Sequence, residues 1–140
     1  MISGILDTNM RIDEPIGRHP VDRKKMAVLS NGRSACSIIK PLMCFKKASH
    51  VQIEIITGRT HQIRVHMSYK KHPIIGDKLY GFKKNIFSKS DNLLDCINSN
   101  FGQYLHAYSL SFIDPSTDSI REYTAPYPKE YQLFLDTISE

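Results

Sequence analysis

Two neighbouring stretches of the chain alternate between apolar and polar residues, which is typical of β-strands with one buried face. Residues 48–57 (ASHVQIEIIT) alternate β-branched with polar side chains and predict one strand. Residues 33–45 (RSACSIIKPLMCF) predict the preceding strand, with a hairpin turn over residues 46–49. Because proline cannot donate a backbone hydrogen bond, Pro41 predicts an edge strand or a bulge.

A helix is predicted after the second strand, over residues 61–71. Thr60 is placed to cap its N-terminus, and Pro73 ends it because the residue before a proline avoids the helical region. Ile63 and Met67, four residues apart, would share the buried side. The roughly opposite side would carry His61, Arg64 and Ser68.

The second half of the chain predicts a strand over residues 105–114, a return strand over 119–124 and a final amphipathic helix over 129–139. A short helix is expected over residues 91–97. Strand hairpins with interspersed helices predict an α+β fold, with a mostly antiparallel mixed sheet and flanking helices. Nothing in the pattern marks a linker, so residues 1–140 are expected to form a single domain.

Composition narrows the class of protein. The chain has 140 residues, 41% of them hydrophobic and 24% charged, which is typical of a globular domain. No apolar run approaches the length of a membrane helix, and the first ten residues lack the basic segment of a signal peptide, so we expect a cytoplasmic protein and no membrane partner. The three cysteines form no CxxC pair and the histidines form no ligand cluster, so we expect no metal site.

Positive charge gathers toward the front of the chain. The net charge is +5, and residues 18–25 (RHPVDRKK) hold four basic side chains. Between positions 23 and 76, Glu54 is the one acidic residue. This distribution fits either a solvated basic face or a surface that binds phosphate groups.

Residues 58–66 (GRTHQIRVH) carry five long polar or charged side chains at a predicted strand-to-helix junction. A helix N-terminus presents unpaired N–H groups and the positive end of the helix dipole, an arrangement that suits a phosphate. On the pattern alone, the stretch is also compatible with an amphipathic helix whose polar groups face water.

Residues 58–81 (GRTHQIRVHMSYKKHPIIGDKLYG) resemble the signature of RluA-type ribosomal large-subunit pseudouridine synthases. Three further segments are similar to that family and extend the resemblance over nearly the whole chain. They are the basic segment 15–26, the segment LHAYSLSF with the following turn at 105–115, and APYPKEYQ at 125–132.

The resemblance implies an RNA enzyme that isomerises uridine to pseudouridine without cofactor or metal. In that family an aspartate of an HRLD-type motif is the catalytic carboxylate, a tyrosine packs on the uracil, and an arginine pairs with the aspartate. The resemblance places that arginine at Arg64 and an apolar residue that packs on the base at Ile63. Because arginine stays protonated and offers a fixed fork of donors, it is the suitable partner for a buried carboxylate.

The resemblance also implies an RNA-binding surface, with ribosomal RNA expected before transfer RNA. Family members take the target base out of its stack, so the surrounding strand must be held through its backbone. The residues assigned to RNA contact are Arg18, His19, Arg23, Lys24, Arg59, His61, Gln62, His66 and His106.

The 140 residues contain no HRLD-type segment. The chain aligns with the C-terminal portion of the family's catalytic domain, and the family's aspartate and tyrosine both precede the matched part. Asp77 matches a family position that orders the loop as a turn residue rather than the catalytic one. We therefore expect the chain to be inactive alone and to expose sheet edges that pair with a complementary N-terminal segment or with a second copy. Alternatives are a non-catalytic RNA-binding remnant or pseudoenzyme, and an unrelated basic α+β domain.

Overall fold

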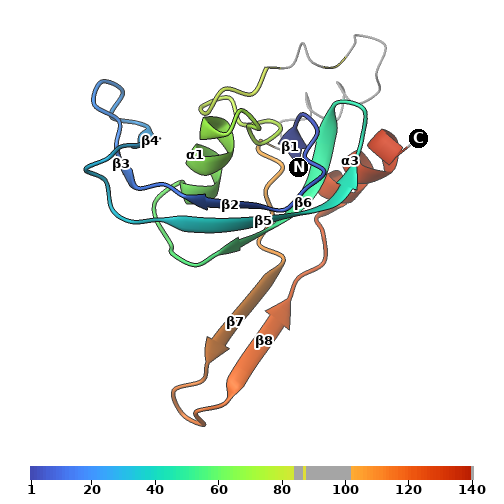
Figure 1. Cartoon of the computed structure of the whole chain (residues 1–140). Coiled ribbons are helices and arrows are strands. Elements are labelled where there is room, and N and C mark those ends of the chain that lie inside the picture. The colour runs from blue at the N-terminus through green and yellow to red at the C-terminus, as the bar shows by residue number, and fades with distance from the viewer. Residues whose placement is uncertain (84–86, 88–101, 140) are drawn as a thin grey trace.

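The computed structural model describes residues 1–83, 87 and 102–139. A four-stranded antiparallel sheet runs in the order β1-β6-β5-β2 (Figure 1). Its strands are β1 (Ile2–Ser3), β2 (Met10–Asp13), β5 (Cys36–Cys44) and β6 (Ala48–Ile55). The predicted α+β class is confirmed, and the expected helix over 91–97 lies outside the described residues.

The long β5–β6 hairpin is the frame of the molecule, and Pro41 lies inside it as a bulge. The register between β5 and β6 shifts between Pro41 and Met43, as the proline predicts. On its other side, β5 pairs with β2 through Cys36–Ile39. The pairing with β2 therefore ends before Pro41, which explains how a proline is accommodated in an inner strand.

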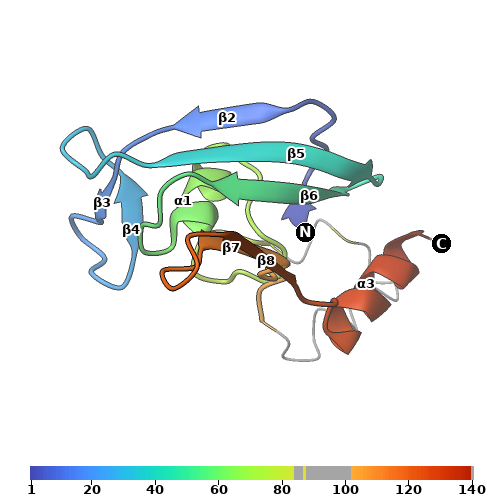
Figure 2. The ribbon, with the colours of Figure 1, turned by 90° about the horizontal axis from the view of Figure 1, so that it is seen from below.

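Helix α1 (Gln62–Tyr69) packs on one side of this hairpin and against β4 (Met26–Val28), as Figure 2 shows from below. Met67 is fully buried, which agrees with the predicted apolar side. The predicted cap is wrong: the residue before the helix is His61, in the left-handed region at φ 56°, and no side chain caps the first turn. The backbone carbonyl of His61 accepts from Val65 N–H instead.

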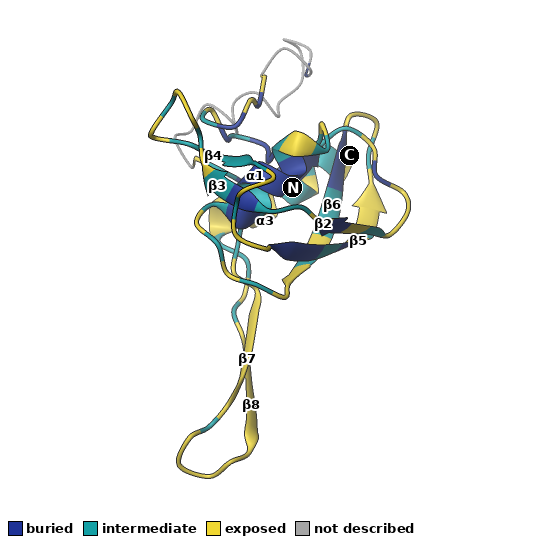
Figure 3. Ribbon diagram, turned by 60° about the vertical axis from the view of Figure 1, so that its left-hand side comes forward, coloured by how far each residue is buried: buried dark blue, intermediate teal, exposed yellow. Residues whose placement is uncertain are grey.

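Two short hairpins lie outside the main sheet. Strands β3 (Ile16–Arg18) and β4 form one of them, and the basic segment is the loop between these strands. Strands β7 (Ser109–Ile113) and β8 (Ile120–Thr124) form the other, which extends away from the body with every strand residue exposed (Figure 3). Strand β7 is shorter than the predicted strand because residues 105–108 form no ladder.

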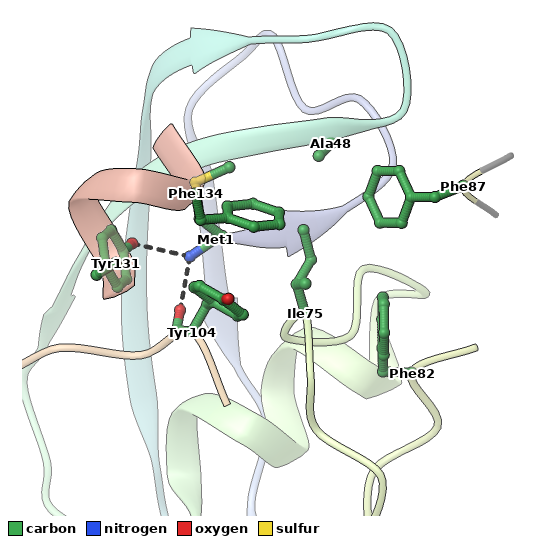
Figure 4. Packing of buried hydrophobic residues seen from close by; sticks show 8 residues of the cluster. All are labelled: Met1, Ala48, Ile75, Phe82, Phe87, Tyr104, Tyr131 and Phe134. Atoms are coloured by element: carbon green, nitrogen blue, oxygen red, sulfur yellow. Dashed lines mark hydrogen bonds between the residues drawn. The ribbon is translucent and has the colours of Figure 1, made fainter. Parts of the chain in front are cut away.

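The largest core cluster joins the two ends of the chain. Helix α3 (Lys129–Ser139) has the predicted bounds, and it buries Tyr131 and Phe134 against Met1 and Tyr104 (Figure 4). The amino group of Met1 donates to the Tyr104 carbonyl at 2.8 Å and lies 3.1 Å from the Tyr131 hydroxyl. Among the described residues, none of the helices has both the length and the apolar character needed to cross a membrane.

Candidate functional site

The first turn of α1 presents Arg64 to the loop that follows the helix. Arg64 Nε donates to Asp77 Oδ2 at 2.7 Å, and Arg64 Nη2 donates to Asp77 Oδ1 at 2.9 Å. The side chain of Asp77 is 1% exposed and that of Arg64 is 15% exposed. Two parallel charge-assisted bonds fix the plane of the guanidinium as well as its position.

Asp77 also shapes its own loop, as expected of a turn residue. Its Oδ1 accepts from the backbone N–H groups of Leu79 and Tyr80, each at 3.2 Å. The sequence analysis assigned Arg64 a carboxylate partner from outside the chain. The structure supplies a partner within it, because the loop after α1 turns the Asp77 carboxylate back toward the helix.

Tyr80 joins three parts of the site. Its ring lies 4.8 Å from the Arg64 guanidinium carbon, within cation–π range. Its hydroxyl lies 2.7 Å from His61 Nδ1 and accepts from Met26 N–H at 2.9 Å. Ser68 Oγ donates to the Tyr80 carbonyl at 2.7 Å. The helix side predicted to carry His61, Arg64 and Ser68 therefore faces this single tyrosine.

The charges of the site shift two pKa values in opposite directions. The hydrogen bond to Asp77 raises the pKa of Arg64, so the guanidinium stays charged. Burial lowers the pKa of His61, and the positive charge of Arg64 lowers it further. His61 is therefore a neutral hydrogen-bonding group at neutral pH, beside a permanent cation.

Ile63 is half-buried on the neighbouring side of α1, where it packs against the cluster of Ile2, Ile39 and Met67. Its position one residue before Arg64 gives the helix an apolar surface next to the guanidinium. The contact of Ile63 with the target base, which the resemblance implies, stays a prediction.

Two residues assigned to RNA contact are internal. Gln62 is buried, with Nε2 donating to the Cys36 carbonyl and Ser37 Oγ, and Oε1 accepting from Thr57 Oγ1 and Arg59 N–H. His66 is also buried, and its ring nitrogens bond Ser37 Oγ and the Glu14 carbonyl. Both side chains tie α1 to the strands, and we remove them from the RNA surface.

The other residues assigned to RNA contact, His61 aside, lie in three places. Arg18, Arg23 and Lys24 are exposed on the β3–β4 hairpin, with Arg18 Nη1 donating to the Arg23 carbonyl at 3.1 Å. His19, on the same hairpin, accepts from the Val21 and Asp22 N–H groups through Nδ1, which leaves the proton on Nε2.

Arg59 and His106 lie apart from that hairpin. Arg59 Nε donates to the Ser34 carbonyl at 2.9 Å, just before α1. His106 contacts the Ala125 carbonyl and the rings of Tyr127 and Tyr131, and so belongs to the aromatic cluster beside α3. Within the described ranges, no group of His, Cys, Asp and Glu is arranged to hold a metal ion.

Sequence reasoning missed Tyr80 and the pairing of Asp77 with Arg64. Both residues lie in GDKLYG, within the matched signature, but their contacts with the helix depend on how the loop after Pro73 returns. A carboxylate and an aromatic ring in one short loop after an arginine-bearing helix was the available signal. This signal does not show which side of the helix the loop contacts.

Comparisons with known proteins identify the relatives of this chain. The family described as RNA pseudouridylate synthase matches residues 3–69. Ribosomal large subunit pseudouridine synthase D of Pseudomonas aeruginosa is 36% identical over 141 aligned residues, covering 100% of this chain and 44% of that protein. The synthase D of Vibrio parahaemolyticus is 39% identical over 91% of this chain and 39% of its own length. This chain thus spans less than half the length of these relatives.

Two solved human structures are also similar. RNA pseudouridylate synthase domain containing 1 superposes with a TM-score of 0.72 and 25% identity, over 91% of this chain and 52% of that one. RNA pseudouridylate synthase domain containing 4 has a TM-score of 0.71 and 21% identity, over 99% and 60%, and shows likeness of fold.

Proposed function

Because this chain belongs to the RNA pseudouridylate synthase family, we propose that it supplies the arginine side of the active site of an RNA uridine-to-pseudouridine isomerase. The observation that carries the proposal is the fixed guanidinium of Arg64, held by Asp77 and lying over Tyr80. The isomerisation breaks the N-glycosidic bond of a uridine, turns the uracil, and joins C5 of the base to the sugar. The hydrogen on C5 is released to water, and no co-reactant is consumed.

The pair with Asp77 leaves part of the guanidinium available. Arginine has five N–H donors, and two of them bond Asp77: the one on Nε and one of the two on Nη2. The remaining edge, formed by Nη1 and the second hydrogen of Nη2, is suited to a second carboxylate or to a base carbonyl. Asp77 thus acts as a positioning residue, while the outer edge of Arg64 meets the reacting groups.

Asp77 itself is a poor candidate for the catalytic carboxylate. Its side chain is 1% exposed, and both oxygens are already occupied by Arg64 and by backbone N–H groups. A carboxylate that must meet a uridine needs an accessible oxygen. We therefore propose that the catalytic aspartate comes from a segment outside these 140 residues, as the missing HRLD-type motif implies, and that the chain alone is inactive.

The remaining assignments follow from this role. Ile63 packs against the target base. Ribosomal RNA is the proposed substrate, and its backbone is held by the basic β3–β4 hairpin together with Arg59. Residues 1–140 correspond to the C-terminal portion of one catalytic domain in a cytoplasmic enzyme that uses no cofactor. The partner that completes the domain is a complementary N-terminal segment, and in its absence a second copy occupies the exposed strands.

Tritium release tests the proposal. Ribosomal RNA carrying tritium at C5 of uridine is incubated with the chain, with a separately made N-terminal half of a synthase that contains the HRLD-type motif, and with both. We expect tritium release from the mixture and none from either part. Turnover by the 140-residue chain alone would contradict the assignment of the aspartate.

A non-catalytic RNA-binding protein is the second candidate, favoured by the absence of an accessible carboxylate beside Arg64 within the described part of the chain. It predicts salt-sensitive RNA binding, since neutralising phosphates releases counterions. It also predicts that no N-terminal half restores turnover. The mixture experiment therefore separates the two functions.

A further inference from the structure

A groove of about 520 Å³ lies between the β3–β4 hairpin, α1 and the loop 78–81. No carboxylate is among the residues that line it. The lining residues used below are His19, Lys25, Ser68, Tyr69, Lys78 and Tyr80. The basic side chains of the lining suit the phosphate of a nucleotide. The tyrosine rings and the apolar lining residues suit its base.

We propose that this groove binds one nucleotide of a single-stranded RNA, adjacent to the target uridine. The phosphate contacts Lys25 and Lys78, and the base stacks on Tyr69. This inference rests on the proposed function for its RNA, but it assigns a place in the fold that the Arg64 site does not include.

The phosphate end is argued from charge. Lys78 is exposed, and no ion pair with it occurs among the described residues. Lys25 is 3.4 Å from Asp22, a partly exposed contact that a phosphate can replace. His19 keeps its proton on Nε2, because Nδ1 accepts two backbone N–H groups, so its ring offers a donor. Three donors, of which only Lys25 has a carboxylate partner among the described residues, favour an anion.

The base end is argued from Tyr69. Its side chain is 48% exposed at the end of α1, with Lys70 Nζ at 5.3 Å from the ring centre. An exposed ring beside a cation is the platform on which single-stranded nucleic acids stack, and it accepts any base.

Tyr80 connects the groove with the Arg64 site. One part of Tyr80 lines the groove, and the same ring lies 4.8 Å from the Arg64 guanidinium carbon. A nucleotide in the groove is therefore separated from the guanidinium by one aromatic ring. This spacing fits a neighbour of the target uridine rather than the uridine itself.

The test is binding of a fluorescently labelled single-stranded oligouridylate to the full 140-residue chain. We expect Tyr69→Ala to weaken binding about tenfold and Tyr69→Phe to leave it unchanged, since phenylalanine retains the stacking face. Lys78→Gln should weaken binding and lower the salt slope by about one. Lys46→Gln is the matched control, because Lys46 is exposed in the β5–β6 turn at the other end of the sheet (Figure 2).

Photo-crosslinking with a 4-thiouridine oligonucleotide gives an answer that does not depend on the variants folding. We expect crosslinks in the peptides that contain Tyr69 or Lys78. Crosslinks confined to other peptides, or equal losses for Lys78→Gln and Lys46→Gln with none for Tyr69→Ala, would overturn the groove. Turnover in the mixture experiment decides the proposed function separately, so either idea can fail while the other stands.

Discussion

Arg64 and Asp77 are joined by two parallel hydrogen bonds, at 2.7 and 2.9 Å, between the first turn of α1 and the loop that follows the helix. The pair links the proposed reactive group to the loop GDKLYG, so the position of the guanidinium depends on the fold of that loop. Because the carboxylate is buried, the pair contributes to stability and to function through the same contact.

Substitution Asp77→Asn should therefore destabilise the chain. It leaves the guanidinium without its counter-charge and turns one acceptor of Arg64 into a donor. We expect a loss of about 2 to 4 kcal/mol in the free energy of unfolding, measured by urea titration. The control is Asp13→Asn, which removes the exposed partner of Arg11 and should leave the unfolding midpoint unchanged. Equal effects of the two variants would contradict a structural role for the Asp77 pair.

Gly76 holds the loop close to the segment before Tyr104. Its φ is 81°, and a Cβ added there would overlap the Gly102 carbonyl oxygen. Gly76→Ala should cost about 3 kcal/mol or more in unfolding free energy, through backbone strain and overlap. Gly58→Ala is the matched control, because a Cβ at Gly58 meets nothing within 4 Å. We expect the unfolding midpoint of Gly58→Ala to equal that of the wild type or to lie slightly above it. A Gly76→Ala variant as stable as the wild type would contradict the close approach of Gly76 to Gly102.

The β7–β8 hairpin should drive self-association through one face. The register pairs Leu110 with Tyr123 and Phe112 with Arg121, so these four side chains share a face. Leu110, Phe112 and Tyr123 are 62%, 43% and 58% exposed. An apolar face of this kind is a site of association. In sedimentation experiments on the chain alone, Leu110→Lys should shift the protein toward monomer.

The control for that experiment is Ser111→Lys, which adds the same charge to the opposite face of the hairpin. It should leave association unchanged. If both lysine variants sediment like the wild type, the hairpin is not the associating surface.

Acidification should destabilise the fold through two histidines, His66, which is buried, and His50, which is half-buried. Burial lowers the pKa of His50 to about 4, and burial also lowers the pKa of His66. Between about pH 6.5 and pH 4 the unfolded chain binds more protons than the native one, so stability falls as the pH falls. For His50 we expect a loss of about 1 to 2 kcal/mol from neutral pH to about pH 5, allowing for its partial exposure. His50→Gln should reduce this pH dependence in urea titrations; an unchanged dependence would remove His50 as its cause.

The sequence predicted those parts of the molecule that depend on local pattern. The β5–β6 hairpin follows from alternation, the bulge from Pro41, and the bounds of α3 from its periodic apolar residues. The cap of α1 was predicted wrongly because the chain reaches the helix through a left-handed residue, His61, and a positive φ is uncommon for residues other than glycine.

Contacts between distant segments could not be predicted in the same way. In sequence, a polar residue that binds a ligand cannot be told from one that is buried and hydrogen-bonded inside the protein. Gln62 and His66 were therefore assigned to RNA contact. Both side chains bond Ser37, which lies 25 residues before Gln62 and 29 before His66, and His66 also bonds the Glu14 carbonyl. The partner of Arg64 was missed for the same reason, since it depends on the return of the loop at Asp77.

The most direct measurement of the central claim is the rate of tritium release by the mixture of both halves when this chain carries Arg64→Ala. We expect a loss of about a hundredfold or more in rate, as for removal of a preorganised charge beside reacting groups, with RNA affinity nearly unchanged. A rate equal to that of the unmodified chain would show that Arg64 takes no part in the reaction.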